Sequence, residues 1–131
     1  MLQLAIDRTN RVLLVSISGL MGPRLLDEAD WAVADALIAE PLIGAAIFDC
    51  SRIEAFAFSQ GRLINRAQTP PIVQGTRVFV TPTGPTGDAI RAYSEYQREA
   101  GQRQPIIVET LEEACRILGL VEPDFRPIEL H

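Results

Sequence analysis

The sequence contains no lysine, and its single histidine is the last residue, His131. All 12 basic residues are therefore arginines. The lack of lysine excludes a P-loop, Schiff-base chemistry and a catalytic lysine base. With histidine confined to position 131, histidine-based triads and metal sites lack their usual residues. These absences predict a protein that is not an enzyme and that needs no cofactor and no metal.

Long hydrophobic runs and clusters of positive charge are also missing. No stretch approaches the roughly 20 apolar residues that span a bilayer, and no basic segment typical of a signal peptide follows Met1. The formal net charge is −5 and the arginines are scattered singly, which argues against binding to nucleic acid or to anionic membranes. We therefore expect a cytoplasmic protein with no membrane span.

Cysteine is scarce as well, because the chain has only Cys50 and Cys115. The two lie far apart, and each is inside an apolar segment. The simplest interpretation is that both are small buried hydrophobic residues. A disulfide or a redox pair is the alternative.

Hydrophobic residues make up 47% of the 131 residues, which is ordinary for one soluble domain. Alternating and β-branched segments predict strands, and apolar residues at helical spacing predict helices. The predicted strands are residues 2–6, 11–18, 45–49, 76–81 and 105–108, and the predicted helices are residues 24–39, 59–67, 88–100 and 110–118.

The order of these elements predicts an α/β fold. The first two strands form an antiparallel hairpin, and the helix after the second strand makes a βαβ crossover to a parallel third strand. We expect a single-layer mixed, mostly parallel five-stranded sheet with about four helices. The domain covers residues 1–120, and residues 121–131 form a C-terminal tail.

Functional residues are expected where strands end, because open α/β sheets gather their sites at the carboxyl ends of strands. Asp49 and Ser51 follow the apolar run 45–48 in this way. The first interpretation is that Asp49 hydrogen-bonds the segment after it. Acid–base catalysis by Asp49 with Glu54 is a less favoured alternative.

Ser59 lies where the second predicted helix begins. Its hydroxyl can accept a hydrogen bond from a free amide of the first turn, as an N-cap. It can also be a phosphorylation site, because a phosphate at a helix N-terminus meets free N–H groups and the positive end of the dipole. Gly61 leaves the backbone accessible in the first turn.

A loop rich in glycine and proline, residues 81–88, follows the fourth predicted strand. It contains Thr83, Gly84, Thr86 and Gly87, and such hydroxyls and glycines ahead of a helix can hold a small anion. The loop lacks the GK[ST] of a P-loop, and its glycines do not fit GxGxxG. An anion or nucleotide site and a plain connecting loop both remain open.

Trp31 and Ile38 project from the outer side of the helix 24–39, opposite its apolar stripe. An exposed tryptophan is less routine than an exposed leucine. The pair is either an oligomer contact, which predicts a homodimer, or is covered by a tail or loop.

Three local patterns occur in a distinctive order: the strand 11–18 closed by Gly19, the strand end Ile47-Phe48-Asp49-Cys50-Ser51, and the segment Thr110-Leu111-Glu112-Glu113-Ala114 with Leu118-Gly119. Together they resemble the STAS superfamily (sulfate transporter and anti-sigma factor antagonist domains) over residues 1–120. In the antagonists of this family, the second helix opens on an Asp-Ser-[Ser/Thr]-Gly motif that carries the phosphorylated residue. Ser59 falls at about that position, with Ala57 and Phe58 before it.

The resemblance implies a non-catalytic regulatory domain that binds an unidentified protein partner and is phospho-regulated at Ser59. An alternative is a small-molecule module for a lipid-like or nucleotide ligand, because Phe56 and Phe58 form an apolar lip. An enzyme that uses Asp49, Glu54 and Ser59 is the least favoured reading. The expected partner or ligand surface comprises Asp49, Ser51, Phe56, Phe58, Ser59, Gly61, Thr83, Gly84, Thr86 and Gly87.

Overall fold

Six strands and four helices make up residues 1–129, the part of the chain that this computed structural model describes; His131 lies outside it. The strands are β1 (Leu2–Asp7), β2 (Val12–Met21), β3 (Ala45–Phe56), β4 (Thr76–Val80), β5 (Ile106–Val108) and β6 (Arg126–Ile128). The helices are α1 (Pro23–Ala39), α2 (Gln60–Ala67), α3 (Pro85–Glu99) and α4 (Leu111–Ile117).

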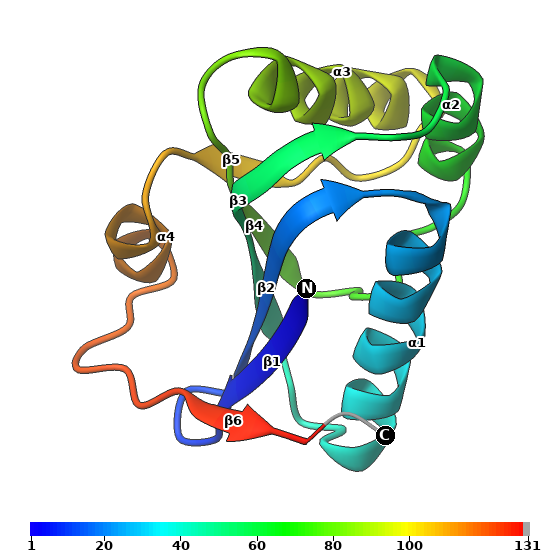
Figure 1. The fold of residues 1–131 in the computed structure, drawn as a ribbon. Coiled ribbons are helices and arrows are strands. Elements are labelled where there is room, and N and C mark those ends of the chain that lie inside the picture. The colour runs from blue at the N-terminus through cyan, green and yellow to red at the C-terminus, as the bar shows by residue number, and fades with distance from the viewer. Residues whose placement is uncertain (130–131) are drawn as a thin grey trace.

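All six strands belong to one sheet, in the order β5-β4-β3-β2-β1-β6 (Figure 1). β2 to β5 are parallel neighbours, and β1 is antiparallel to β2. β2 and β3 are joined through α1, as the crossover predicted. The predicted mixed, mostly parallel α/β fold with four helices is confirmed.

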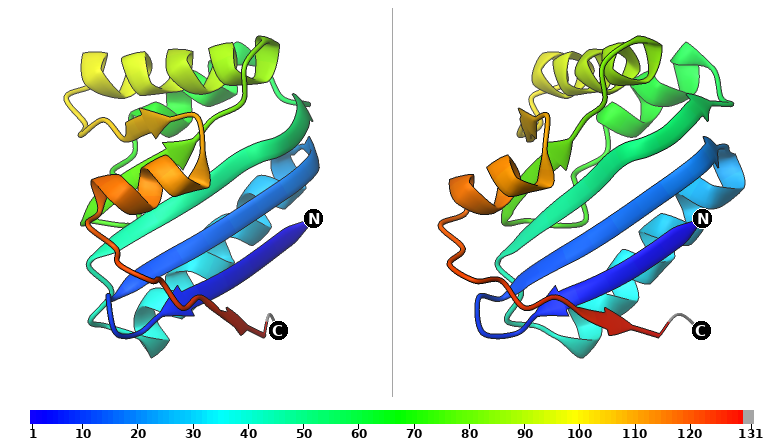
Figure 2. Two further views of the ribbon diagram at one scale, coloured as in Figure 1. Left: turned by 90° about the vertical axis from the view of Figure 1, so that its left-hand side faces the viewer. Right: turned by 60° about the vertical axis from the view of Figure 1, so that its left-hand side comes forward.

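The predicted number of five strands is wrong, because residues 126–128 form a sixth strand beside β1. β6 pairs antiparallel with β1, with Leu4 opposite Ile128 (Figure 2). The segment contains Pro127, which discouraged a strand prediction, yet proline is tolerated on an edge strand because one side of that strand has no ladder to complete. The segment after residue 120 therefore adds a strand to the same sheet.

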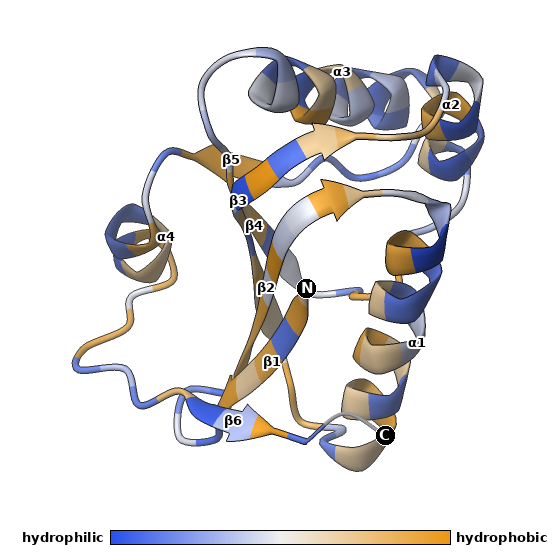
Figure 3. Cartoon of the chain, in the orientation of Figure 1, coloured by the Kyte–Doolittle hydropathy of each residue, from blue (hydrophilic) through white to orange (hydrophobic). Residues whose placement is uncertain are grey.

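The two faces of the sheet are covered unequally. α1, α2 and α3 lie over one face, and α4 lies over part of the other (Figure 1). Hydrophobic residues are concentrated in the strands, and hydrophilic residues lie on the outer sides of the helices (Figure 3). Successive side chains of a strand point to opposite faces, so Leu13 and Val15 enter the core under α1 while Ile47 and Val78 enter the core under α4.

Two of the element boundaries that differ from the prediction affect the candidate site. β3 continues to Phe56 instead of ending at Asp49, and its last part pairs with the end of β2 after two register shifts. These shifts break the alternation of polar and apolar residues after Asp49, so the pattern did not show a strand. α3 begins at Pro85 instead of Asp88, because proline suits the first position of a helix.

Candidate functional site

Asp49 and Ser51 lie on the face of the sheet opposite α1. An Asp49 carboxylate oxygen, Oδ1, accepts hydrogen bonds from the Ser51 backbone N–H at 3.1 Å and from the Ser51 hydroxyl at 2.6 Å. Asp49 also borders a shallow polar depression with Gln3, Ser16 and Arg52. The neighbouring Phe48 and Cys50 point to the other face. Asp49 and Ser51 are thus separated from the residues around Ser59 by the sheet itself.

Ser59 is exposed and caps α2. Its hydroxyl oxygen accepts a hydrogen bond from the Arg62 backbone N–H at 3.2 Å, which satisfies one of the free amides of the first turn. Next to it in sequence, the Gln60 side-chain amide donates to the Tyr96 hydroxyl at 2.6 Å and ties α2 to α3. The geometry therefore fixes the position of the Ser59 hydroxyl while leaving it open to solvent.

Phe56 and Phe58 pack against each other just before α2. Their ring centroids are 5.3 Å apart, and both side chains are half-buried. The distance is within the range of favourable aromatic pairs. Gly61, in the first turn of α2, is exposed, and an added Cβ would meet only the Ser59 hydroxyl oxygen, at 3.8 Å. The structure thus brings Phe56, Phe58, Ser59 and Gly61 together, and these four residues are called the Ser59 surface below.

The loop before α3 divides into an exposed part and a buried part. Thr83 and Gly84 are exposed, and Gly84 has a φ of 86°, a conformation that favours glycine. Thr86 and Gly87 are buried, and the Thr86 hydroxyl donates to the Glu54 carbonyl of β3 at 3.3 Å. A Cβ at Gly87 would approach the Pro82 carbonyl oxygen to 1.9 Å. Thr86 therefore ties α3 to β3, and Gly87 lets α3 pack closely on the loop at Pro82. Thr83 and Gly84 are the two of these four residues that are open to a partner.

Trp31 and Ile38 are exposed on α1, with 67% and 79% of their surfaces accessible. Nothing among residues 1–129 covers them. They lie on the outer side of the helix, away from the buried Ala29, Val33 and Ala36.

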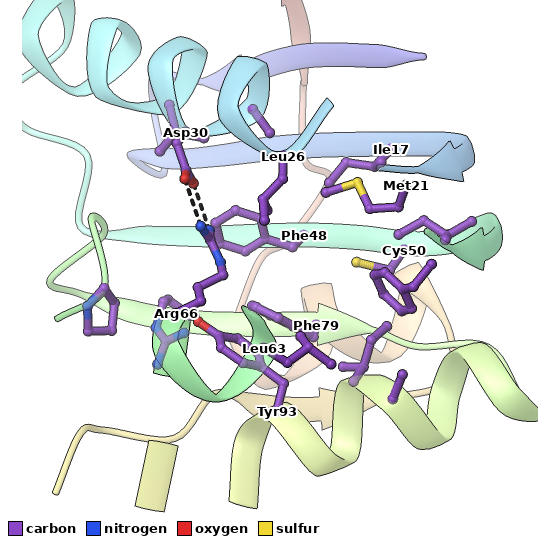
Figure 4. A pocket seen from close by; sticks show the side chains of 18 of the residues that line it. Ile17, Met21, Leu26, Asp30, Phe48, Cys50, Leu63, Arg66, Phe79 and Tyr93 are labelled. Atoms are coloured by element: carbon purple, nitrogen blue, oxygen red, sulfur yellow. Dashed lines mark hydrogen bonds and ion pairs between the residues drawn. The ribbon is translucent and has the colours of Figure 1, made fainter. Parts of the chain in front are cut away.

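The structure also contains a pocket that sequence reasoning missed, between the sheet and α1, α2 and α3 (Figure 4). It has a volume of about 120 Å³ and mostly apolar walls. Phe48 and Phe79 lie on adjacent strands in its floor, with ring centroids 5.0 Å apart. The lining also includes Phe56 and Phe58, so the pocket lies directly beneath the Ser59 surface.

One end of the pocket is charged. Arg66 of α2 forms two hydrogen bonds with the Asp30 carboxylate of α1, at 2.7 and 2.6 Å, and Tyr93 of α3 lies beside it (Figure 4). Burial works against the charged form of Arg66, but the hydrogen bonds and charge of Asp30 outweigh it and raise its pKa. Arg77 of β4 is 5% exposed, and burial lowers the pKa of its guanidinium. In the sequence, the position of Arg77 inside the β-branched run 76–81 is a signal that this arginine is buried, because the run predicts a strand.

Both cysteines are free thiols, and Cys50 is buried in the pocket wall. Burial, together with the nearby charge of Asp49, raises the pKa of the Cys50 thiol to about 12. Cys50 is therefore un-ionised and unreactive at neutral pH. Residues 1–129 contain no group of three carboxylate, thiol or imidazole side chains that could hold a metal ion, and no helix in this range is long and apolar enough to cross a membrane.

The sheet order, the α1 crossover and the placement of α2 after β3 define a STAS-like fold. The solved structure of the anti-sigma factor antagonist SpoIIAA in its unphosphorylated form is similar to this chain, with a TM-score of 0.59. The match covers 92% of this chain and 100% of that chain, at 15% sequence identity. No family model and no curated protein matches the sequence. At this identity the similarity shows the fold, and it confirms the predicted STAS-like architecture.

Proposed function

We propose that this chain is a non-catalytic regulatory domain that binds a protein partner through the Ser59 surface, and that phosphorylation of Ser59 controls this binding. The domain acts in the cytoplasm, where the free thiols Cys50 and Cys115 fit a reducing environment. The sequence offers no lysine, and Asp49 is engaged by Ser51, so neither an activated nucleophile nor a paired general base supports an enzyme.

The observation that carries the proposal is the exposed Ser59 hydroxyl at the start of α2. It occurs in a fold that is similar to a solved structure described as an anti-sigma factor antagonist in its unphosphorylated form. The apolar rings of Phe56 and Phe58 lie beside this hydroxyl and give a partner something to bury. Phosphorylation of the Ser59 hydroxyl would thus place a charge beside the apolar surface that the partner buries, and this would switch partner binding off.

A phosphate on Ser59 would add a charge of about −1.5 to −2 without unfolding α2. The free amides at the helix N-terminus and the positive end of its dipole stabilise such a charge. Arg62 is exposed one turn further along α2, and one of its terminal nitrogens is 3.9 Å from an Asp27 carboxylate oxygen. A change of side-chain rotamer would bring Arg62 to the phosphate on Ser59. A partner that covers Phe58 would then have to desolvate a dianion, so phosphorylation should release it.

The test compares partner capture by the wild type, Ser59→Asp and Ser59→Ala. Aspartate keeps the N-cap and adds the charge, so we expect Ser59→Asp to lose the partner that the wild type and Ser59→Ala retain. Thr110 provides a matched control, because it caps α4 by accepting from the Glu113 N–H at 3.1 Å. Thr110→Asp should leave capture unchanged. Mass spectrometry of the native protein should find phosphate on Ser59; equal capture by all variants would contradict the switch.

Trp31 and Ile38 are proposed as a homodimer contact. The removal of two large exposed apolar side chains from water would stabilise an association of two copies. Light scattering after gel filtration should show that Trp31→Ser lowers the measured mass toward that of one chain. Val121→Ser is the control, because Val121 is even more exposed, at 82%, but belongs to the segment after α4 instead of to α1. A wild-type protein that is monomeric at all concentrations contradicts this contact.

A further inference from the structure

The pocket under α1, α2 and α3 contains a buried cation, Arg77, for which the described part of the chain supplies no counter-charge. Arg77 is 5% exposed, and its Nε has no hydrogen-bond partner among residues 1–129. One terminal nitrogen donates to the Arg103 carbonyl, and no ion pair within residues 1–129 involves Arg77. A buried guanidinium without a carboxylate is costly, so its retention points to a partner from outside the chain.

The charges that line the pocket define this partner. They are Asp30, Arg66 and Arg77, and Asp30 is already held by both terminal nitrogens of Arg66. The lining therefore has one unbalanced positive charge. The Tyr93 hydroxyl accepts a hydrogen bond from the Gln97 side-chain amide at 3.1 Å, which leaves its own proton free to be donated. A planar monoanion that only accepts hydrogen bonds, a carboxylate, matches these donors.

The apolar walls and the volume define the rest of the ligand. A cavity of roughly 150 Å³ lined by apolar side chains holds a benzene molecule. The pocket here, at about 120 Å³ and partly open, therefore suits a hydrocarbon body close to that size. Phe48 and Phe79 supply a flat surface for it, and Arg77 lies over the Phe79 ring with its guanidinium carbon 5.9 Å from the centroid. The charged group thus adjoins the apolar surface.

We propose that this pocket binds an apolar monocarboxylate, whose carboxylate pairs with Arg77 and Tyr93 while its hydrocarbon body lies against Phe48 and Phe79. The proposal goes beyond the regulatory function, because it requires neither phosphorylation nor a protein partner. Ligand binding is measured on the isolated chain, so a failure of the pocket and a failure of the Ser59 switch are seen in separate experiments.

Calorimetric titration with octanoate, octanol and acetate tests both parts of the proposed ligand. Octanoate should bind tightest, because octanol lacks the charge and acetate lacks the hydrocarbon body. Shortening the acid should weaken binding by about fourfold for each buried methylene removed. Equal affinity for octanoate and octanol would overturn the role of Arg77, and no binding of millimolar octanoate would overturn the site.

Two pocket variants and one control complete the test. Arg77→Met should weaken octanoate binding about tenfold or more and leave octanol binding unchanged, because a charged hydrogen bond is lost. Ala89→Phe should block both ligands by filling the pocket from α3 while Arg77 stays in place. Arg116→Met removes an exposed arginine of α4 and should change neither. Unchanged octanoate affinity in folded Arg77→Met, or in folded Ala89→Phe, would refute the proposal.

Discussion

The two faces of the sheet are built from similar residues but are filled differently. Under α4, Ile47, Val78 and Ala114 are fully buried and close-packed. Under α1, α2 and α3, the same strands present Phe48, Phe79 and Arg77 to a pocket, and residues 1–129 provide no ion pair for the buried Arg77 guanidinium. The difference shows that one face is optimised for stability and the other keeps space and charge that stability alone does not require.

The largest expected effect comes from removing bulk on the packed face. Ile47→Ala should lower the free energy of unfolding by about 3–5 kcal/mol, because its neighbours cannot relax into the new cavity. Ile53 lines the pocket, so Ile53→Ala enlarges a space that already exists and should cost less, about 2–3 kcal/mol. Denaturant titration of both variants measures the comparison. Equal losses would mean that the two faces are packed alike.

The packed face is closed at its edge by Asp7, which accepts hydrogen bonds from Asn10 and from the Asp124 backbone N–H. Burial alone would raise the pKa of Asp7, but these hydrogen bonds lower it below its usual 3.8. Asp7→Asn should cost about 1.5–3 kcal/mol at neutral pH.

A lowered pKa fixes the sign of the pH dependence. The Asp7 charge makes its full contribution to the free energy of unfolding above pH 3.8, which is the pKa of this group in the unfolded chain. That contribution is lost as the pH falls through the lower pKa of the folded state. The gap between wild type and Asp7→Asn should therefore close only in acid, when unfolding is followed by circular dichroism. A gap that already closes near neutral pH would contradict this assignment.

A larger side chain should destabilise the face under α4 more than the face that contains the pocket. Ala114 is fully buried, so Ala114→Leu should overpack the α4 face and cost about 1–3 kcal/mol. Ala89 faces the pocket from α3, and Ala89→Leu should be nearly neutral because it has space to occupy. Thermal unfolding of the two variants measures the difference. A larger loss for Ala89→Leu would show that the pocket is closed in solution.

The smallest expected effect is at the helix caps, where the two faces should behave alike. Ser59 and Thr110 each accept a hydrogen bond from the amide three residues later, at 3.2 and 3.1 Å. Ser59→Ala and Thr110→Ala should each cost about 1 kcal/mol. Equal losses would show that any special role of Ser59 lies in partner binding. A much larger loss for Ser59→Ala would assign it a structural role instead.

The sequence was informative about the fold where the physical signals were local. Apolar runs marked the positions of five of the six strands, and Ser59 and Thr110 marked two helix starts. The extension of β3 past Asp49 was hidden because register shifts disturb its alternation. β6 was not predicted for two reasons. Pro127 is unusual in a strand, and the pairing of β6 with β1 joins residues about 120 positions apart in the chain.

The candidate site was predictable only in part, for the same reason. The neighbours Phe56, Phe58 and Ser59 are close in sequence, and they remain close in space. The pocket is built from six elements, which are β2, β3, β4, α1, α2 and α3, and the pairing of Asp30 with Arg66 joins residues 36 positions apart. No local pattern reports that Arg77, one arginine among 12, is buried with no counter-charge from residues 1–129. Asp49 and Ser51 were predicted as site residues, and they do contact each other, but they lie on the face of the sheet opposite the pocket.

The face under α1, α2 and α3 keeps a buried charge, Arg77, at the expense of stability, because residues 1–129 offer it no counter-charge. The free energy of unfolding of Arg77→Met without ligand tests this claim most directly. Replacement of a buried charge by an apolar side chain of similar length should leave stability unchanged or raise it by about 1–4 kcal/mol. A loss of more than about 1 kcal/mol, beyond what one hydrogen bond contributes, would show that Arg77 is there to hold the fold together and would contradict the account.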